Sequence, residues 1–226
     1  MLQFPVSTQF GRRIPKQKFY QNLDVSSEIK RMFVEQVRLI TWANKLSPET
    51  MNLAPGETVQ EIEVFQIRIA GETLDDHVLQ VMDRQIPYHL LFILERPDGR
   101  QCLCIAYKEA SLSGSNAFQL RQSYRTEWSA PEDLTLQFSG LNMDTLYENI
   151  VRQIAGDTLD TSNSASLSEA VTAAQEREKL QKQIAQLKSR MRKEKQLARQ
   201  MELRREIQKL ESMLYEVEQK HFFQFY

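Results

Sequence analysis

The stretch that decides the fold is YHLLFILERPDGRQCLCIAYKE, residues 88–109. Residues 88–95 contain the longest apolar run of the chain, Leu90 to Leu94, and predict its clearest strand. Residues 97–100, Pro-Asp-Gly-Arg, are a strong turn signal, and residues 101–109 have strand character again. The stretch therefore predicts a β-hairpin inside a sheet.

The residues before this hairpin predict a second strand and a short helix. Residues 59–70 are rich in Val, Ile and Phe, but their alternation is imperfect. A strand that is buried on both sides, or that contains a bulge, has such a pattern. Residues 71–86 have the spacing of a short helix that ends at Ile86-Pro87. The two strands that flank this helix can be parallel, joined by a crossover connection.

Farther out, the sequence adds two helices and two short strands. A helix is expected from Ser26 or Ser27, either of which can cap it, to about Leu46, where Ser47-Pro48 stops it. Residues 123–128 and 134–138 predict short strands, and a helix follows Asn142. This mixture predicts an α+β fold with flanking helices on a mostly antiparallel sheet, followed by a long C-terminal helical arm.

The composition changes after Gly156, and we divide the chain there. Residues 1–156 form the α+β domain, 157–168 a polar linker, 169–220 a basic helical arm and 221–226 an aromatic tail. The arm has two apolar seams with coiled-coil spacing that are out of register with each other. They consist of Leu180, Ile184, Leu187 and Met191, and of Leu203, Ile207, Leu210, Leu214 and Val217.

Two structures fit the arm. One is a single bent helix of about 50 residues, and the other is an antiparallel hairpin that turns near residues 195–200. In both, the seam needs another apolar surface, so a homo-oligomer through the coiled coil is one possibility.

Charge is divided unevenly along the 226 residues, whose net charge is −1. Residues 1–160 contain 16 Lys and Arg against 21 Asp and Glu, whereas residues 161–226 contain 13 against 9. A basic arm on an acidic body indicates an anionic partner such as DNA, although a solvated coiled-coil exterior has the same composition. The nine basic residues of the arm that we single out are Lys188, Arg190, Arg192, Lys193, Lys195, Arg199, Arg204, Arg205 and Lys209.

Aromatic residues cluster at the end of the chain. We expect Phe222, Phe223, Phe225 and Tyr226 to dock onto this protein or onto a partner, because exposed apolar patches usually mark an interface. We expect the aromatic residues Trp42, Tyr107 and Trp128 to fill the core and not to line a groove.

Catalytic and cofactor-binding motifs are not evident. The glycines form no phosphate-binding loop, and the three histidines and two cysteines do not have the spacing of a zinc site, so we predict no cofactor and no metal. Cys102 and Cys104 are two residues apart on one strand, which suits reduced thiols in the cytoplasm. No signal peptide and no apolar run long enough for a membrane span is evident.

One set of residues supports an enzymatic alternative. Glu61, Glu63, Asp83 and Lys108 are residue types that Mg²⁺-dependent nucleases of the Asp…Glu-x-Lys type place on adjacent strands. Ala106 stands two positions before Lys108, where such an enzyme has a carboxylate ligand. Three interpretations of these residues therefore stay open: an active nuclease, a decayed nuclease-like fold and ordinary surface charge.

Several short phrases occur together in a recognisable order. They are Ile14-Pro15-Lys16, Phe19-Tyr20, Ile40-Thr41-Trp42, Lys45-Leu46-Ser47-Pro48, Glu61-Ile62-Glu63-Val64-Phe65, Ile86-Pro87-Tyr88, Ala106-Tyr107-Lys108, Leu146-Tyr147-Glu148 and Lys193-Glu194-Lys195-Gln196. The ordered set resembles the uncharacterised prokaryotic family catalogued as domain of unknown function 4391. The resemblance implies gene neighbours that encode helicases and DNA methyltransferases of restriction-like systems.

The hypothesis that follows is a non-catalytic accessory subunit of a bacterial DNA-modification or phage-defence assembly. It would bind a helicase or methyltransferase, and its basic arm would reach DNA or a second protein. The alternatives are a nuclease-like enzyme that uses Mg²⁺ or has lost its activity, and a self-associating structural protein.

Overall fold

The structure is a computed structural model that describes residues 2–22, 24–110, 118–159 and 166–220. Two compact units make up the chain, Met1–Gly156 and Asp157–Tyr226. We describe each unit separately.

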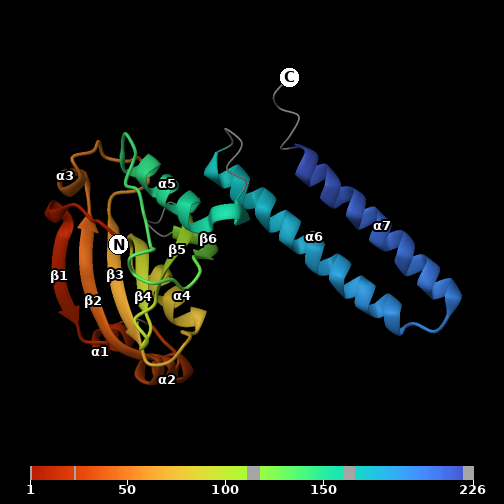
Figure 1. Cartoon of the computed structure of the whole chain (residues 1–226), viewed down its shortest axis with the longest axis horizontal. Helices are drawn as coiled ribbons and strands as arrows, with labels where there is room; N and C mark the ends of the chain where they lie inside the picture. The colour runs from red at the N-terminus through yellow and green to blue at the C-terminus, as the bar shows by residue number, and fades with distance from the viewer. Residues whose placement is uncertain (1, 23, 111–117, 160–165, 221–226) are drawn as a thin grey trace. The chain divides into compact units, whose positions relative to one another are not determined.

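The first unit is built on one six-stranded sheet in which the strands lie side by side in sequence order (Figure 1). Neighbouring strands are antiparallel except β3 and β4, which are parallel. The helix α4 (Asp76–Gln85) makes the crossover between these two. The strands are β1 (Gln9–Ile14), β2 (Val37–Leu46), β3 (Ile62–Ile69), β4 (His89–Glu95), β5 (Gln101–Ala110) and β6 (Phe118–Arg125).

Helices pack on both faces of the sheet, which confirms the α+β prediction. One face packs against α1 (Gln17–Asn22), α2 (Ser27–Gln36) and α4. The core on this face includes Phe33 from α2, Val78 from α4 and the strand residues Phe65 and Phe92. The other face packs against α5 (Met143–Ala155), whose Tyr147 ring lies 4.3 Å from the ring of His89. The central strand β3 is buried on both sides, as its apolar pattern predicts.

The predicted helix from Ser26 to Leu46 is wrong in its second half. Helix α2 starts as expected, because the Ser26 side chain accepts a hydrogen bond from the backbone N–H of Ile29. The chain then leaves the helix after Gln36 and continues as β2, which pairs with β1 and β3. Val37, Ile40, Thr41 and Trp42 are β-branched or aromatic, so they fit a sheet between two partners better than a helix.

The edges of the sheet also differ from the prediction. Strand β6 begins at Phe118 and ends before Thr126, so it only overlaps the expected strand 123–128. Residues 134–138 are not a strand, although Leu134 and Leu136 are buried. Strand β1 is not predicted from the sequence; it has a register shift between Gln9 and Arg12 and a glycine at positive φ, Gly11.

Local capping chemistry fixes the other helices of this unit. Asn142 and Thr145 form a capping box at the start of α5, where the sequence predicts it. Ser47 and Thr50 form another at the short helix α3 (Pro48–Met51). The carboxylate of Asp144 accepts hydrogen bonds from the backbone N–H groups of Glu57, Thr58 and Val59, which attaches the loop before β3 to α5. A short 3-10 helix, Val6–Thr8, precedes β1.

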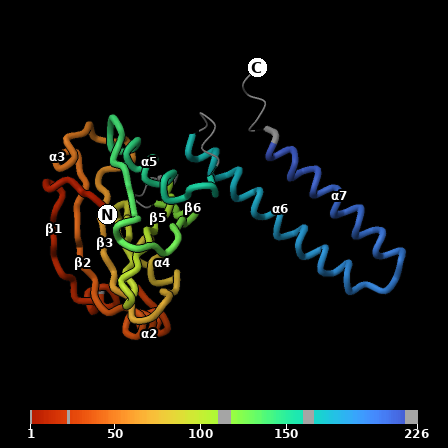
Figure 2. Tube along the Cα trace, viewed as in Figure 1, coloured from red at the N-terminus to blue at the C-terminus, as the bar shows by residue number. Residues whose placement is uncertain are grey.

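The second unit is a helical hairpin, so the bent single helix is excluded. Helix α6 (Leu167–Lys193) and helix α7 (Leu197–Lys220) run side by side in opposite directions (Figures 1 and 2). The turn comprises residues 194–196, close to the predicted turn, and the Glu194 side chain accepts hydrogen bonds from the backbone N–H groups of Lys195 and Gln196. A one-turn 3-10 helix, Gly156–Thr158, lies at the boundary between the units.

The two apolar seams pack against each other inside this hairpin. Ile184 and Leu187 of α6 and Ile207 of α7 are buried, and four more seam residues pack against them, Met191, Leu203, Leu210 and Leu214. The seam that the sequence shows as unpartnered is therefore partnered within the chain. Among the described residues, no helix is both long and apolar enough to cross a membrane.

Candidate functional site

An open cavity of about 270 Å³ lies on the face of the sheet that packs against α1, α2 and α4. Its walls come from β1, α1, β2, β3 and the connection between α4 and β4. Most of the lining is apolar, and half of the lining residues are aromatic. The lining residues are Ile14, Lys18, Phe19, Trp42, Glu63, Phe65, Ile86 and Tyr88.

Ring contacts hold the aromatic walls in place. The ring centroid of Phe65 lies 6.0 Å from that of Trp42 and 6.1 Å from that of Phe19, in an edge-on arrangement with the latter. On its other side Trp42 lies 4.2 Å from the ring of Phe10. Such contacts fix side-chain orientation and add to the burial energy of aromatic groups. Trp42 is expected to fill the core, but it is only half-buried and also forms a wall of the pocket.

A chain of polar contacts leads from the cavity to the surface of the sheet. Trp42 Nε1 donates a hydrogen bond of 2.6 Å to Glu63 Oε2. The Glu61 carboxyl group, two residues before Glu63, is close enough to raise the pKa of Glu63, and Lys45 Nζ lies 2.8 Å from Glu61 Oε1. Two carboxyl groups thus face one ammonium group.

The buried member of this chain is Glu63, of which 3 % is exposed. Burial raises its pKa to about 7, and the neighbouring Glu61 carboxyl acts in the same direction, whereas the Trp42 N–H and Lys45 oppose the rise. A carboxyl group that titrates near neutral pH, in an aromatic pocket, is the type of group that binding and active sites use.

The other two residues of the nuclease alternative, Asp83 and Lys108, form a separate buried ion pair. Lys108 Nζ lies 3.0 Å from Asp83 Oδ1 and donates a hydrogen bond of 2.8 Å to the backbone oxygen of Tyr88. Burial raises the Asp83 pKa to about 6 and lowers the Lys108 pKa, although each partner opposes the change in the other. The pair joins α4 to β5 and to the residue before β4.

The structure brings Glu61 together with Glu63, and Asp83 together with Lys108. In the described part of the chain, no three His, Cys, Asp or Glu side chains are grouped so that they could hold a metal ion. The four residues therefore do not form one metal site here.

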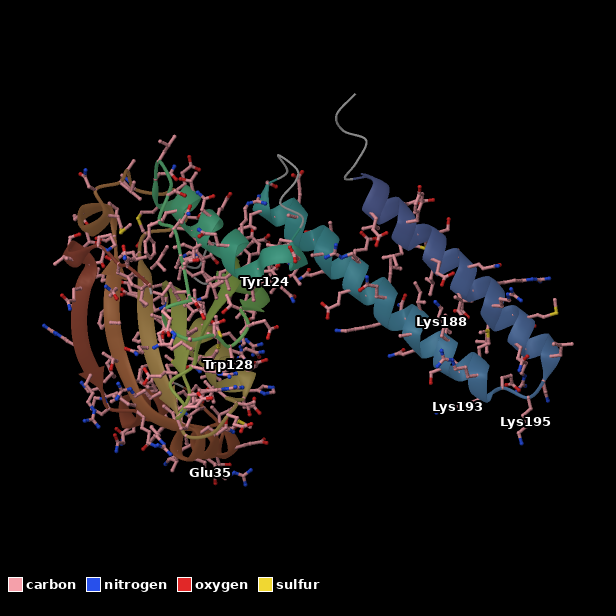
Figure 3. The ribbon with its side chains drawn as sticks, viewed as in Figure 1. Glu35, Tyr124, Trp128, Lys188, Lys193 and Lys195 are labelled. Carbon is pink, nitrogen blue, oxygen red and sulfur yellow. The ribbon has the colours of Figure 1, made fainter. Side chains whose placement is uncertain are left out.

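The nine basic residues lie in the part of the hairpin nearer its turn, as far as Lys209 halfway along α7, and all nine are exposed. Lys193 is the last residue of α6, Lys195 lies in the turn, and Lys188 lies about two turns of helix before the turn (Figure 3). Lys188 forms an ion pair of 2.7 Å with Glu211 of the facing helix. We call residues 188–209 the basic tip; they contain nine Lys and Arg and three Glu.

Two further expectations concern the cysteines and the aromatic residues. Cys102 and Cys104 are free, buried thiols with their sulfur atoms 4.0 Å apart.

Tyr107 is buried as expected, and Trp128 is half-buried beneath the guanidinium of Arg96, which lies 4.0 Å from its ring centroid. The predicted docking residues Phe222, Phe223, Phe225 and Tyr226 lie outside the described residues.

Sequence reasoning missed the pocket as a site. Its walls come from five separate segments, and no regular spacing connects them. The sequence contains one signal for the pocket. Glu63 lies between Ile62 and Val64 in a mostly apolar strand, and an acidic residue within a buried strand needs an explanation.

The comparison with family models gives one result that covers nearly the whole chain. A model described as a domain of unknown function, DUF4391, matches residues 2–214. The chain belongs to the DUF4391 family. Comparison with curated proteins and with solved structures gives no match. Several of the phrases on which the resemblance rests, those that contain Ile14, Phe19, Trp42, Glu63 and Tyr88, supply walls of the pocket of this DUF4391 member.

Proposed function

We propose that this DUF4391 protein is a non-catalytic accessory subunit of a bacterial DNA-modification or phage-defence assembly in the cytoplasm. The body, residues 1–156, binds a helicase or methyltransferase, and the basic tip of the hairpin contacts DNA phosphates. The observation that supports this proposal best is the set of nine exposed basic side chains in the part of the hairpin nearer its turn.

Charge makes the tip the favoured point of contact with DNA. The tip has a net charge of +6, from nine basic and three acidic residues, whereas residues 1–160 have a net charge of −5, from 16 basic and 21 acidic residues. A polyanion is attracted to the first and repelled by the second. Each phosphate that a Lys or Arg neutralises releases counterions, which gives strong binding at low salt.

The residue types at the tip indicate contact with the phosphate backbone and not with bases. Residues 188–209 contain no aromatic side chain on which a base could stack. Lys and Arg contacts to phosphates position a protein on DNA without reading its sequence. We therefore expect binding with little sequence preference, so specificity in the assembly would come from the partner.

The two alternatives have less support. Packing of the seam residues Ile184, Leu187 and Ile207 within the hairpin removes the sequence argument for dimerisation through that seam. For the nuclease, Asp83 and Lys108 are paired with each other and Glu63 lies in a different contact chain with Glu61.

Fluorescence anisotropy with a labelled 20-base-pair duplex, in low salt, tests the DNA half of the proposal. The tip variant replaces Arg190, Arg192, Lys193 and Lys195 by Gln, which keeps helix propensity. A matched control replaces Arg31, Arg84, Lys179 and Lys182 by Gln, so the net charge changes equally. We expect the tip variant to bind at least about 100-fold more weakly than wild type and the control to bind within about threefold. Equal losses in both would contradict contact at the tip.

The partner half is tested by purification of the tagged full-length protein from its own host, followed by mass spectrometry. A helicase or methyltransferase should copurify in a defined ratio and remain bound when nuclease removes DNA. Recovery of the protein as a stable monomer with neither partner would contradict the accessory-subunit role.

A further inference from the structure

We infer that the aromatic pocket of the body binds a methylated ammonium cation, with Trp42, Phe19, Phe65 and Tyr88 as its walls and Glu63 as its counter-charge. This site is separate from the basic tip and does not depend on the proposed function.

The aromatic composition of the walls is the first argument. Four of the lining residues have π-systems, and the contacts of Phe65 with Trp42 and Phe19 arrange three of these rings around one space. The face of an aromatic ring attracts a cation, most strongly for Trp, and the attraction grows when the cation leaves water. A cage of several rings is a known way for proteins to recognise methylated ammonium groups.

The charge balance around Glu63 is the second argument. The Glu61 and Glu63 carboxyl groups are neighbours, and Lys45 neutralises one carboxylate through its contact with Glu61. Glu63 receives the Trp42 N–H, which is a neutral donor. Lys45, Glu61 and Glu63 taken together are neutral only when one carboxyl group holds a proton, and Lys18, the other cation of the lining, is on an exposed side chain. A ligand cation in the pocket can replace that proton.

The lining also selects between kinds of ammonium group. A primary ammonium carries three N–H donors, and apart from Glu63 the apolar walls offer few acceptors for them. A quaternary ammonium has no N–H group to satisfy and presents methyl groups to the rings. The volume of about 270 Å³ suits a small ligand head.

Lys18 also lines the cavity, and its ammonium group lies on an exposed side chain. A bound cation would be repelled by this charge. Lys18→Met should therefore strengthen binding of a cation by a few-fold, whereas it should not strengthen binding of a neutral ligand.

Calorimetric titration of the full-length protein with choline, and with its neutral isostere 3,3-dimethylbutan-1-ol, tests the inference. The two probes have nearly the same shape, so only charge distinguishes them. We expect choline to bind at least tenfold more tightly than the alcohol. Equal or tighter binding of the alcohol, or no binding of choline at millimolar concentration, would overturn the inference.

A second titration distinguishes the source of the methylated group. N-acetyl-trimethyl-lysine amide represents a side chain on a protein, and choline represents a free small molecule. Tighter binding of one assigns the natural source to that class, provided that both bind more tightly than the alcohol. Failure of both to do so overturns the inference.

The pH dependence adds a readout that a merely apolar pocket would not give. The titratable groups beside Glu63 or in the lining of the cavity are Glu61, Lys45, Lys18 and Tyr88, and burial raises the pKa of Glu63 to about 7. Choline binding should strengthen by several-fold as pH rises from 6 to 8 and should release a proton. Binding that is independent of pH would contradict the role of Glu63 as counter-charge.

Variants separate this site from general stability. Glu63→Gln keeps an acceptor for Trp42 and should weaken choline binding at least tenfold and abolish its pH dependence. The chain has two tryptophans, so Trp128→Phe leaves Trp42 as the sole indole reporter and serves as the control for Trp42→Phe. Choline should quench Trp42 fluorescence in Trp128→Phe, and Trp42→Phe should weaken binding several-fold. An unaltered affinity in Glu63→Gln and Trp42→Phe would overturn the assignment.

Discussion

The body and the hairpin of this protein differ in how their sequences specify structure. In the hairpin, two helices that are neighbours in sequence pack through residues with regular spacing, such as Ile184 and Ile207. In the body, a six-stranded sheet brings together segments that are far apart, and its pocket uses residues from Ile14 to Tyr88. Periodicity therefore identifies the packed residues of the hairpin, whereas function in the body depends on contacts that no local pattern shows.

The largest expected effect comes from a charged residue in the apolar seam of the hairpin. Ile184→Asp places a carboxylate among Leu187, Ile207 and their neighbours, which costs about 3 kcal/mol or more. We expect circular dichroism at 222 nm to show a loss of helix from the hairpin, while the thermal transition of the body is unchanged.

Ser189→Asp is the control, because Ser189 is exposed on the same helix and should tolerate the charge. If the body melts at a lower temperature in Ile184→Asp, the two units are not energetically separate, contrary to our interpretation.

The next effect concerns the body alone. The hydroxyl of Tyr147 donates to the backbone oxygen of Ala106, at 2.6 Å, and accepts from the backbone N–H of Lys108, at 3.0 Å. These groups flank the register shift of β5 against β6. Tyr147→Phe leaves both buried groups without this partner and should lower the free energy of unfolding by about 2–3 kcal/mol.

Chemical denaturation of Tyr147→Phe and of Tyr215→Phe measures this effect. Tyr215 is 62 % exposed on α7, so loss of its hydroxyl should be nearly neutral. Equal effects in the two variants would mean that the Tyr147 hydroxyl does not hold the β-bulge.

The smallest expected effect concerns the buried carboxyl group of Glu63 in the pocket of the body. Glu63 has a pKa of about 7 in the fold against an ordinary value of 4.5, so the fold disfavours its ionised form. The cost is absent below pH 4.5, grows as pH rises from 4.5 to 7 and is constant above that range. Glu63→Gln should therefore stabilise the protein by about 1–2 kcal/mol at pH 8, after allowance for screening by polar neighbours, and should have little effect at pH 4.5.

Urea denaturation at the two pH values tests this prediction. Asp144 provides the contrast, because its carboxylate accepts backbone N–H groups that lower its pKa although burial opposes this. Asp144→Asn should destabilise at pH 8. Stabilisation by both substitutions, or by neither, would show that the pKa of Glu63 does not reflect an unfavourable buried charge.

Much of the fold could be predicted where the signal is local. The start of α5 at Asn142 and of α2 at Ser26 follows from capping, and the β4–β5 hairpin follows from its turn residues. Residues 37–46 could not be assigned correctly, because their apolar residues fit a helix as well as a strand, and only pairing with β1 and β3 decides between them.

The two candidate sites also differ in how well the sequence predicts them. The basic tip is a cluster in sequence and is found by counting charges, whereas the pocket appears only when β2 and β3 place Trp42 beside Glu63. Glu63 was singled out as a possible metal ligand, and its observed neighbours are an indole and a second carboxyl group. Spacing could not show this, because the partner of Glu63 on β2 depends on the register shift between Trp42 and Asn44.

The most direct test of the central claim is the salt dependence of duplex DNA binding by the full-length protein and by the tip variant. Each neutralised phosphate contributes about −0.9 to the slope of the logarithm of the binding constant against the logarithm of salt concentration. If Arg190, Arg192, Lys193 and Lys195 contact phosphates, their replacement should make the slope less steep by about 3–4. An unchanged slope, or an equal change in the matched control, would contradict a DNA-contacting role for the hairpin tip.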